Sequence, residues 1–134
     1  MSNQAHEVTP RDAVRRAQEA VQRAERLIGD EARADALSAV TDALNAAAGA
    51  LERSTDPRVT FGQYAAWYVR DAAAVVWDAT QRQRFLDSGG RDPVRYDVAL
   101  LPLDMARRAL LAAAYALDAA DARAWPTEGE GADA

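Results

Sequence analysis

The sequence predicts an all-α protein, an antiparallel four-helix bundle, and three observations support this prediction. Apolar residues recur at spacings of three and four along four segments, no segment alternates with the two-residue period of a strand, and short breaker segments separate the four. The predicted helices cover residues 10–28, 30–53, 60–88 and 102–124, with a short turn or helix at 92–100. We expect a single domain over 10–125, between a disordered lead-in at 1–9 and a disordered acidic tail at 126–134.

The first two predicted helices carry regular helical patterns. Thr9 before Pro10 is typical of a helix start, because the hydroxyl can cap the first turn and proline needs no hydrogen-bond donor there. Gly29 is a typical end for the first helix. The predicted core seams are Val14, Ala17, Val21, Ala24 and Ile28 in the first helix, and Leu37, Val40, Leu44, Ala47 and Leu51 in the second.

The third predicted helix is rich in aromatic side chains. It begins at the capping-box pair Thr60 and Gln63 and holds six of the nine aromatic residues of the chain. At about 100° per residue, its predicted core face consists of Phe61, Ala65, Tyr68, Ala72, Val75, Val76, Ala79 and Leu86. Trp67 and Phe85 then fall roughly 120° from the centre of this face and Trp77 roughly 160° from it. These three rings therefore need another contact or lie exposed.

The fourth predicted helix also has apolar side chains outside its seam. The seam follows Pro102 and consists of Leu103, Ala106, Leu110, Ala113, Leu117, Ala120 and Ala124. Residues 109–117 are apolar all round apart from the Tyr115 hydroxyl, a pattern typical of burial on several sides. Leu111 and Tyr115 fall about 120° to 160° from the centre of the seam, which leaves them for a further contact.

Composition disfavours several classes of function. The chain has no cysteine, which removes disulfides, thiolate nucleophiles and cysteine-based metal sites, and its one histidine, His6, lies in the lead-in. We expect no metal and no cofactor. A net charge of -5 argues against a nucleic-acid binder. Since no apolar stretch has bilayer length and no signal-peptide pattern is present, we expect a cytoplasmic protein without a membrane contact.

Two clusters on and after the third helix are candidate binding sites. A candidate small-ligand pocket consists of Tyr64, Trp67, Tyr68, Arg70 and Asp71, with Tyr115 or Trp125 as a further wall. A candidate anion site around the Gly-Gly turn consists of Arg82, Arg84, Arg91 and Arg95, since arginine forks and free backbone N–H groups bind phosphate. Interleaved aspartates and the helix dipole explain the same arginines without a ligand.

An enzyme is the least favoured class. Its acid–base groups would be Asp71 and Asp78, with Tyr64 or Tyr68. Seven residues along a helix span roughly 10.5 Å, too far for the two carboxylates to share one ion or proton without help from another helix.

The favoured hypothesis is a non-enzymatic interaction protein that acts as a regulator, adaptor or inhibitor of another protein. Aromatic rings and leucines outside a core seam are typical of protein contacts, and a symmetric homodimer would cover them. The predicted interface consists of Trp67, Trp77, Phe85, Leu111 and Tyr115. A ligand-binding module that uses the aromatic pocket is the alternative.

Overall fold

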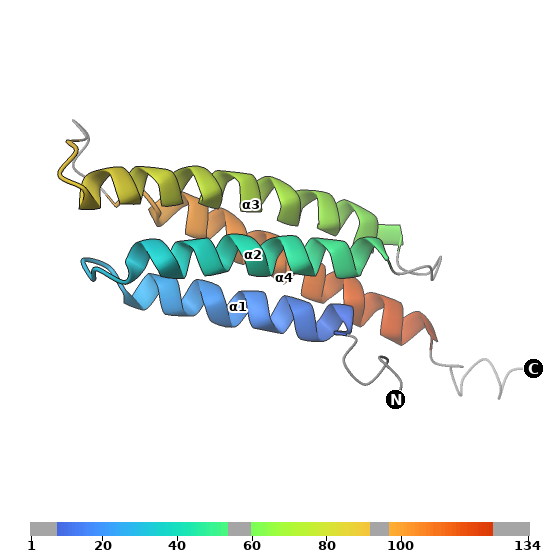
Figure 1. The fold of residues 1–134 in the computed structure, drawn as a ribbon. Helices are drawn as coiled ribbons and strands as arrows, with labels where there is room; N and C mark the ends of the chain where they lie inside the picture. The colour runs from blue at the N-terminus through green and yellow to red at the C-terminus, as the bar shows by residue number, and fades with distance from the viewer. Residues whose placement is uncertain (1–7, 54–59, 92–96, 125–134) are drawn as a thin grey trace, which may run out of the picture.

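The computed structural model describes residues 8–53, 60–91 and 97–124, without the side chains of 60–63 and 121–124. Four α-helices make up this part of the chain, which confirms the predicted all-α bundle (Figure 1). They are α1 (Pro10–Arg26), α2 (Arg33–Glu52), α3 (Thr60–Asp87) and α4 (Leu100–Ala124). The predicted acidic tail, and most of the predicted lead-in and of the turn at 92–100, lie outside the described residues.

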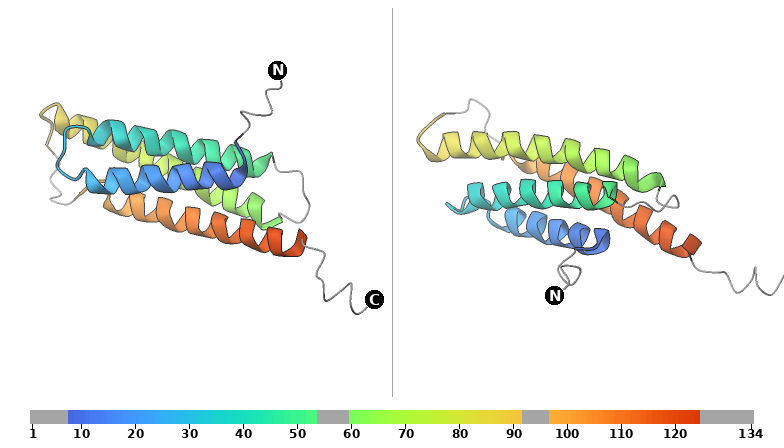
Figure 2. Two further views of the ribbon diagram at one scale, coloured as in Figure 1. Left: turned by 90° about the horizontal axis from the view of Figure 1, so that it is seen from below. Right: turned by 45° about the vertical axis from the view of Figure 1, so that its right-hand side comes forward.

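The helices form a ring in which consecutive helices run in opposite directions (Figure 1). α1 and α3 each pack against α2 and α4. The packing is most extensive between α2 and α3 and least extensive between α1 and α4. Figure 2 shows α1 and α4 side by side when the bundle is seen from below. One side of the ring is therefore closely packed, and the opposite side is more open.

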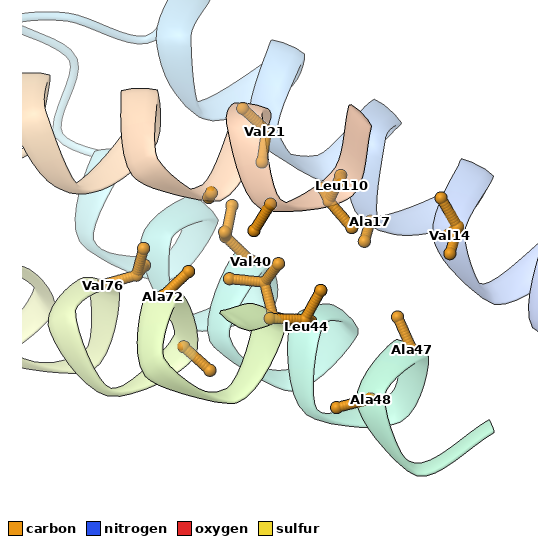
Figure 3. Packing of buried hydrophobic residues seen from close by; sticks show 14 of the residues in the cluster. Val14, Ala17, Val21, Val40, Leu44, Ala47, Ala48, Ala72, Val76 and Leu110 are labelled. Carbon is orange, nitrogen blue, oxygen red and sulfur yellow. The ribbon is translucent and has the colours of Figure 1, made fainter. Parts of the chain in front are cut away.

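The core is built from small and medium-sized aliphatic side chains. In Figure 3, Val21 of α1, Leu44 of α2, Val76 of α3 and Leu110 of α4 converge between the helices. Every residue of the predicted α2 seam is buried, as are the α1 seam up to Ala24 and the α4 seam up to Ala120. A core with so much alanine lets the helices approach closely.

The first turn between helices differs from the prediction at both of its ends. α1 ends at Arg26 instead of residue 28, so Ile28, predicted to be buried, is 65% exposed. α2 begins at Arg33 instead of residue 30. The reason lies in Asp30, whose carboxylate accepts the N–H of Ala32 at 2.8 Å and whose carbonyl accepts the N–H of Arg33 at 3.1 Å. Asp30 thereby forms a separate turn before the helix.

The start of α4 also differs from the prediction. The helix begins at Leu100 instead of near residue 102. Asp97 initiates it, because its carboxylate accepts the N–H of Ala99 at 3.0 Å and its carbonyl accepts the N–H of Leu100 at 3.1 Å. Pro102 consequently lies in the first turn of the helix, where its missing N–H leaves no hydrogen bond broken.

The buried face of α3 is rotated from the predicted one. Tyr68, predicted to lie in the core, is 64% exposed, whereas Val69 and the hydroxyl-bearing Thr80 are buried. The buried side chains of α3 are Ala65, Ala66, Val69, Ala72, Ala73, Val76, Ala79 and Thr80. The centre of this buried face is rotated by roughly 65° around the helix axis from the centre of the predicted core face. Thr80 tolerates burial because its hydroxyl donates to the Val76 carbonyl at 2.8 Å.

The core position of Leu44 can be tested by truncation. Because Leu44 is fully buried, Leu44→Ala is expected to lower the free energy of unfolding by about 2–5 kcal/mol. Leu101→Ala removes the same atoms from an exposed side chain and is expected to change it by about 0.5 kcal/mol or less. Urea denaturation followed by circular dichroism measures both, and equal losses would contradict the described packing.

Candidate functional site

The outward surface of α3 carries a row of aromatic side chains, which we call the α3 outer face. Its rings belong to Tyr64, Trp67, Tyr68, Trp77 and Phe85, and each is between 56% and 68% exposed. Measured around the axis of α3, Trp67 and Phe85 lie roughly 170° from the centre of the buried face, and Trp77 lies roughly 90° from it. Trp67 and Phe85 therefore lie on the side of α3 opposite its core, and the other three residues flank them.

The end of α3 positions Phe85. Gly89 takes a positive φ of 93°, which a side chain would disfavour, and the next N–H, from Gly90, donates to the Phe85 carbonyl at 2.9 Å. A Cβ atom added at Gly90 would overlap the Phe85 ring. The ring is thus packed over the backbone of the turn while more than half of it stays exposed.

Leu111, one of the two predicted interface residues of α4, does not lie on one surface with those of α3. Tyr115 is 77% exposed and Leu111 is also exposed. Leu111 lines a pocket with Gln18 and Gln22 of α1, so it lies on the α1 side of α4, away from α3. The structure therefore places the three rings of α3 on one helix face and separates Leu111 from them.

The residues of the predicted ligand pocket are spread over an open helix surface. Tyr64, Trp67, Tyr68 and Asp71 are all exposed, and none of them lines the two pockets described between α1 and α4. Arg70, the predicted polar anchor, is already engaged. It donates two hydrogen bonds to the carboxylate of Glu52 on α2, at 2.5 and 2.8 Å. These bonds lower the pKa of Glu52 below its ordinary value near 4.5.

The arginines of the predicted anion site are exposed, and one has an intrahelical partner. Arg82 lies 3.6 Å from the Asp78 carboxylate one turn earlier on α3. Arg84 and Arg91 are exposed, and Arg95 lies outside the described residues. Among the described residues, no group of three or more histidine, aspartate or glutamate side chains could hold a metal ion. Asp71 and Asp78 therefore belong to no such group.

A buried ion pair that the sequence analysis missed joins α2 to the start of α4. Arg33 is only 3% exposed, and its guanidinium forms two hydrogen bonds with the carboxylate of Asp97, one through Nη1 and one through Nη2 at 2.8 Å. A pattern in the sequence pointed to it, because Arg33 continues the α2 seam four residues before Leu37. The Nε atom of Arg33 is buried without a hydrogen-bond partner among the described residues.

Two pockets lie along the seam between α1 and α4. One, of about 240 Å³, includes Arg33 and Asp97 together with the apolar residues Ile28, Leu100, Leu101 and Leu103. The other, of about 260 Å³, lies between the middle parts of the same helices. Glu25 and Arg107 line both pockets and form an ion pair across the seam. The pockets are thus two parts of one groove, separated by that pair.

Comparison with models of protein families, with curated proteins and with solved structures found no match for this chain. None of the described helices combines the length and hydropathy that are needed to cross a bilayer.

The structural role of the Arg33–Asp97 pair can be tested by removing its negative charge. Asp97→Asn retains a side-chain oxygen for the N–H of Ala99 but leaves the buried guanidinium uncompensated, so a loss of about 3 kcal/mol in the free energy of unfolding is expected. In the exposed pair of Arg11 with Asp118, Asp118→Asn is expected to lose less than about 1 kcal/mol. Similar losses in both variants would show that the buried pair does not stabilise the end of the bundle.

Proposed function

We propose that this protein is a non-enzymatic interaction protein, a regulator, adaptor or inhibitor of another protein, that assembles as a homodimer through the aromatic surface of α3. One observation carries the proposal: five aromatic side chains between residues 64 and 85 are more than half exposed on a single helix. Exposed apolar side chains that occur singly need no explanation, but five large exposed rings on one helix are typical of a binding surface.

The types of side chain on this surface support a protein contact. Tryptophan and tyrosine contribute a large contact area at a small entropic cost, and they dominate the binding energy of many interfaces. The α3 outer face also carries both signs of charge, Asp71 and Asp78 beside Arg82.

The same residues are poorly arranged for catalysis. Asp71, Asp78 and the two tyrosines Tyr64 and Tyr68 all lie exposed on the α3 outer face. An acid–base group functions best in a concave site that excludes water and shifts its pKa. An exposed helix surface provides neither, which favours a contact surface over a reaction site.

The homodimer can be tested by native mass spectrometry together with light scattering. We expect a mass of twice 14.5 kDa for the wild-type chain. Trp77→Asp places a charge in the apolar surface and is expected to shift the population towards monomer without loss of helix content. Ile28→Asp is the matched control, because it puts the same charge on an exposed apolar side chain at the turn between α1 and α2. A monomeric wild-type chain at all accessible concentrations would contradict self-association.

A second candidate function is binding of a small ligand in the groove between α1 and α4. The observation that favours it is the buried Arg33 Nε–H without a partner, on a residue that lines a pocket of about 240 Å³ with an apolar rim. A neutral compound with an apolar body and a carbonyl group matches this lining, because the carbonyl would accept the orphan N–H.

Amide NMR shift mapping with a library of neutral carbonyl-bearing fragments tests this second candidate. Binding should shift the signals of Arg33 and Leu103, and Ile28→Asp on the rim should weaken it about tenfold. Trp77→Asp, on the other side of the bundle, serves here as the control that should leave binding unchanged. Shifts confined to the α3 outer face, or no shifts at all, would rule out this groove.

A further inference from the structure

The Arg33–Asp97 pair links the starts of two helices that lie on a diagonal of the ring. Arg33 is the first residue of α2, and Asp97 accepts the N–H of Ala99 immediately before α4. α2 and α4 run in the same direction, and each of them packs against α1 and α3 (Figure 1). The pair therefore connects the two helices at the end of the bundle where both begin.

Three features of Arg33 oppose folding. Its guanidinium is removed from water, because the side chain is only 4% exposed. It lies in the first turn of α2, where the helix dipole disfavours a positive charge. Its Nε–H is buried without a hydrogen-bond partner among the described residues. An apolar side chain of similar length would avoid all three, so net stability does not explain this pair.

The core repeats its residue types, and not only its spacing, every seven residues. The buried stripe along α4 includes Ala99, Ala106, Ala113 and Ala120, which alternate with Leu103, Leu110 and Leu117. Repeats of the same kind are Leu37, Leu44 and Leu51 in α2, Val14 and Val21 in α1, and Val69 and Val76 in α3. A slide of α4 by seven residues, about 10.5 Å, places alanine at alanine sites and leucine at leucine sites over most of the helix. Such a core specifies the axial position of α4 only weakly.

We propose that the Arg33–Asp97 pair sets the axial register of α4 in the bundle and adds no net stability. A buried charge with one matching partner favours the single arrangement that brings the two together, as buried polar residues do in coiled coils. Asp97 suits this role, because the same carboxylate also caps the start of α4. The position of the helix and the point at which it begins are thus determined together.

The neighbouring registers offer Arg33 no equivalent partner. A slide of seven residues brings either Gly90 or Asp104 level with Arg33. Gly90 carries no charge, and Asp104 is already paired with Arg107 at 3.2 Å and with Arg108 at 3.0 Å. The observed register, by contrast, pairs Arg33 without taking the partner of another arginine.

Replacing both members of the pair separates register from stability. Arg33→Met keeps the length of the side chain without its charge, and Asp97→Asn keeps an oxygen for the N–H of Ala99. Asp97→Asn alone is expected to lower the urea midpoint by about 1–2 M, because the guanidinium stays buried without a compensating charge. The double variant removes both charges, so its midpoint is expected within about 0.3 M of wild type.

A distance between two spin labels measures the register. The chain has no cysteine, so Ala39→Cys on α2 and Ala112→Cys on α4, both exposed, place one label on each helix. Ala39 lies six residues after Arg33 and Ala112 lies fifteen after Asp97, which offsets the labels by nine residues, about 13.5 Å along the helix axes. A slide by seven residues changes this offset by about 10.5 Å. Double electron–electron resonance detects the change, and dilution with unlabelled chain removes distances between copies.

We expect one narrow distance in the labelled wild-type chain and a second, shifted distance in the double variant. Arg33→Met alone leaves the more exposed Asp97 to be hydrated, so it is expected to show the same second distance and replaces the double variant if that does not fold. The matched control is Glu52→Gln with Arg70→Met, which removes the exposed two-bond pair between α2 and α3. This control is expected to keep the single distance.

The outcomes decide whether the pair acts on register. A double variant with the midpoint of wild type and a second distance supports the proposal. One unchanged distance in both Arg33 variants overturns it, because the core then specifies the register alone. A double-variant midpoint as low as that of Asp97→Asn also overturns it, because the pair then contributes net stability. A second distance in the control variant overturns it as well, since the loss of register would not be specific to this pair.

Discussion

The close packing of α3 on α2 determines what the rest of the molecule presents to its surroundings. Between residues 64 and 87, where its side chains are described, α3 buries only alanine, valine and threonine, with Val69 and Val76 at the centre of that face. Side chains of this size allow the close approach of two helices, whereas Tyr68 or Trp67 in the same positions would hold them apart. Because the small residues occupy the core, the large rings are left on the outside. The aromatic surface is thus a consequence of how α3 packs.

The opposite side of the bundle is organised by charge. α1 and α4 pack least extensively, and the ion pairs Arg11–Asp118 and Arg107–Glu25 connect them across the groove. At one end of this groove the buried Arg33 pairs with the partly buried Asp97, and the two hydrogen bonds between them offset part of the cost of removing the charges from water. Asp97 also starts α4, so one carboxylate orders both the helix start and the end of the bundle.

Much of this fold could be predicted from the sequence, and the differences have physical causes. Every residue predicted for the α2 seam is buried, because its leucines and valine recur at helical spacing, but Arg33 at the start of the same seam was missed. The α3 face was predicted about 65° away, because Tyr68, Val75 and Leu86 were counted as core while the buried Ala66, Val69, Ala73 and Thr80 were not. The exposure of Trp67, Trp77 and Phe85 followed from helical phase alone, but their separation from Leu111 depends on the order of the helices in the ring. The pockets between α1 and α4 depend on the same order of helices, which cannot be predicted from the spacing of residues along a single helix.

The central claim is that the rings of α3 are exposed in one copy and covered by another. Quenching of tryptophan fluorescence by acrylamide tests it most directly, in a Trp125→Phe variant whose only tryptophans are Trp67 and Trp77. The account predicts strong quenching in dilute solution that weakens as the protein concentration rises and the rings become covered. Quenching of equal strength at every concentration, or rings already protected in a monomer, would contradict it.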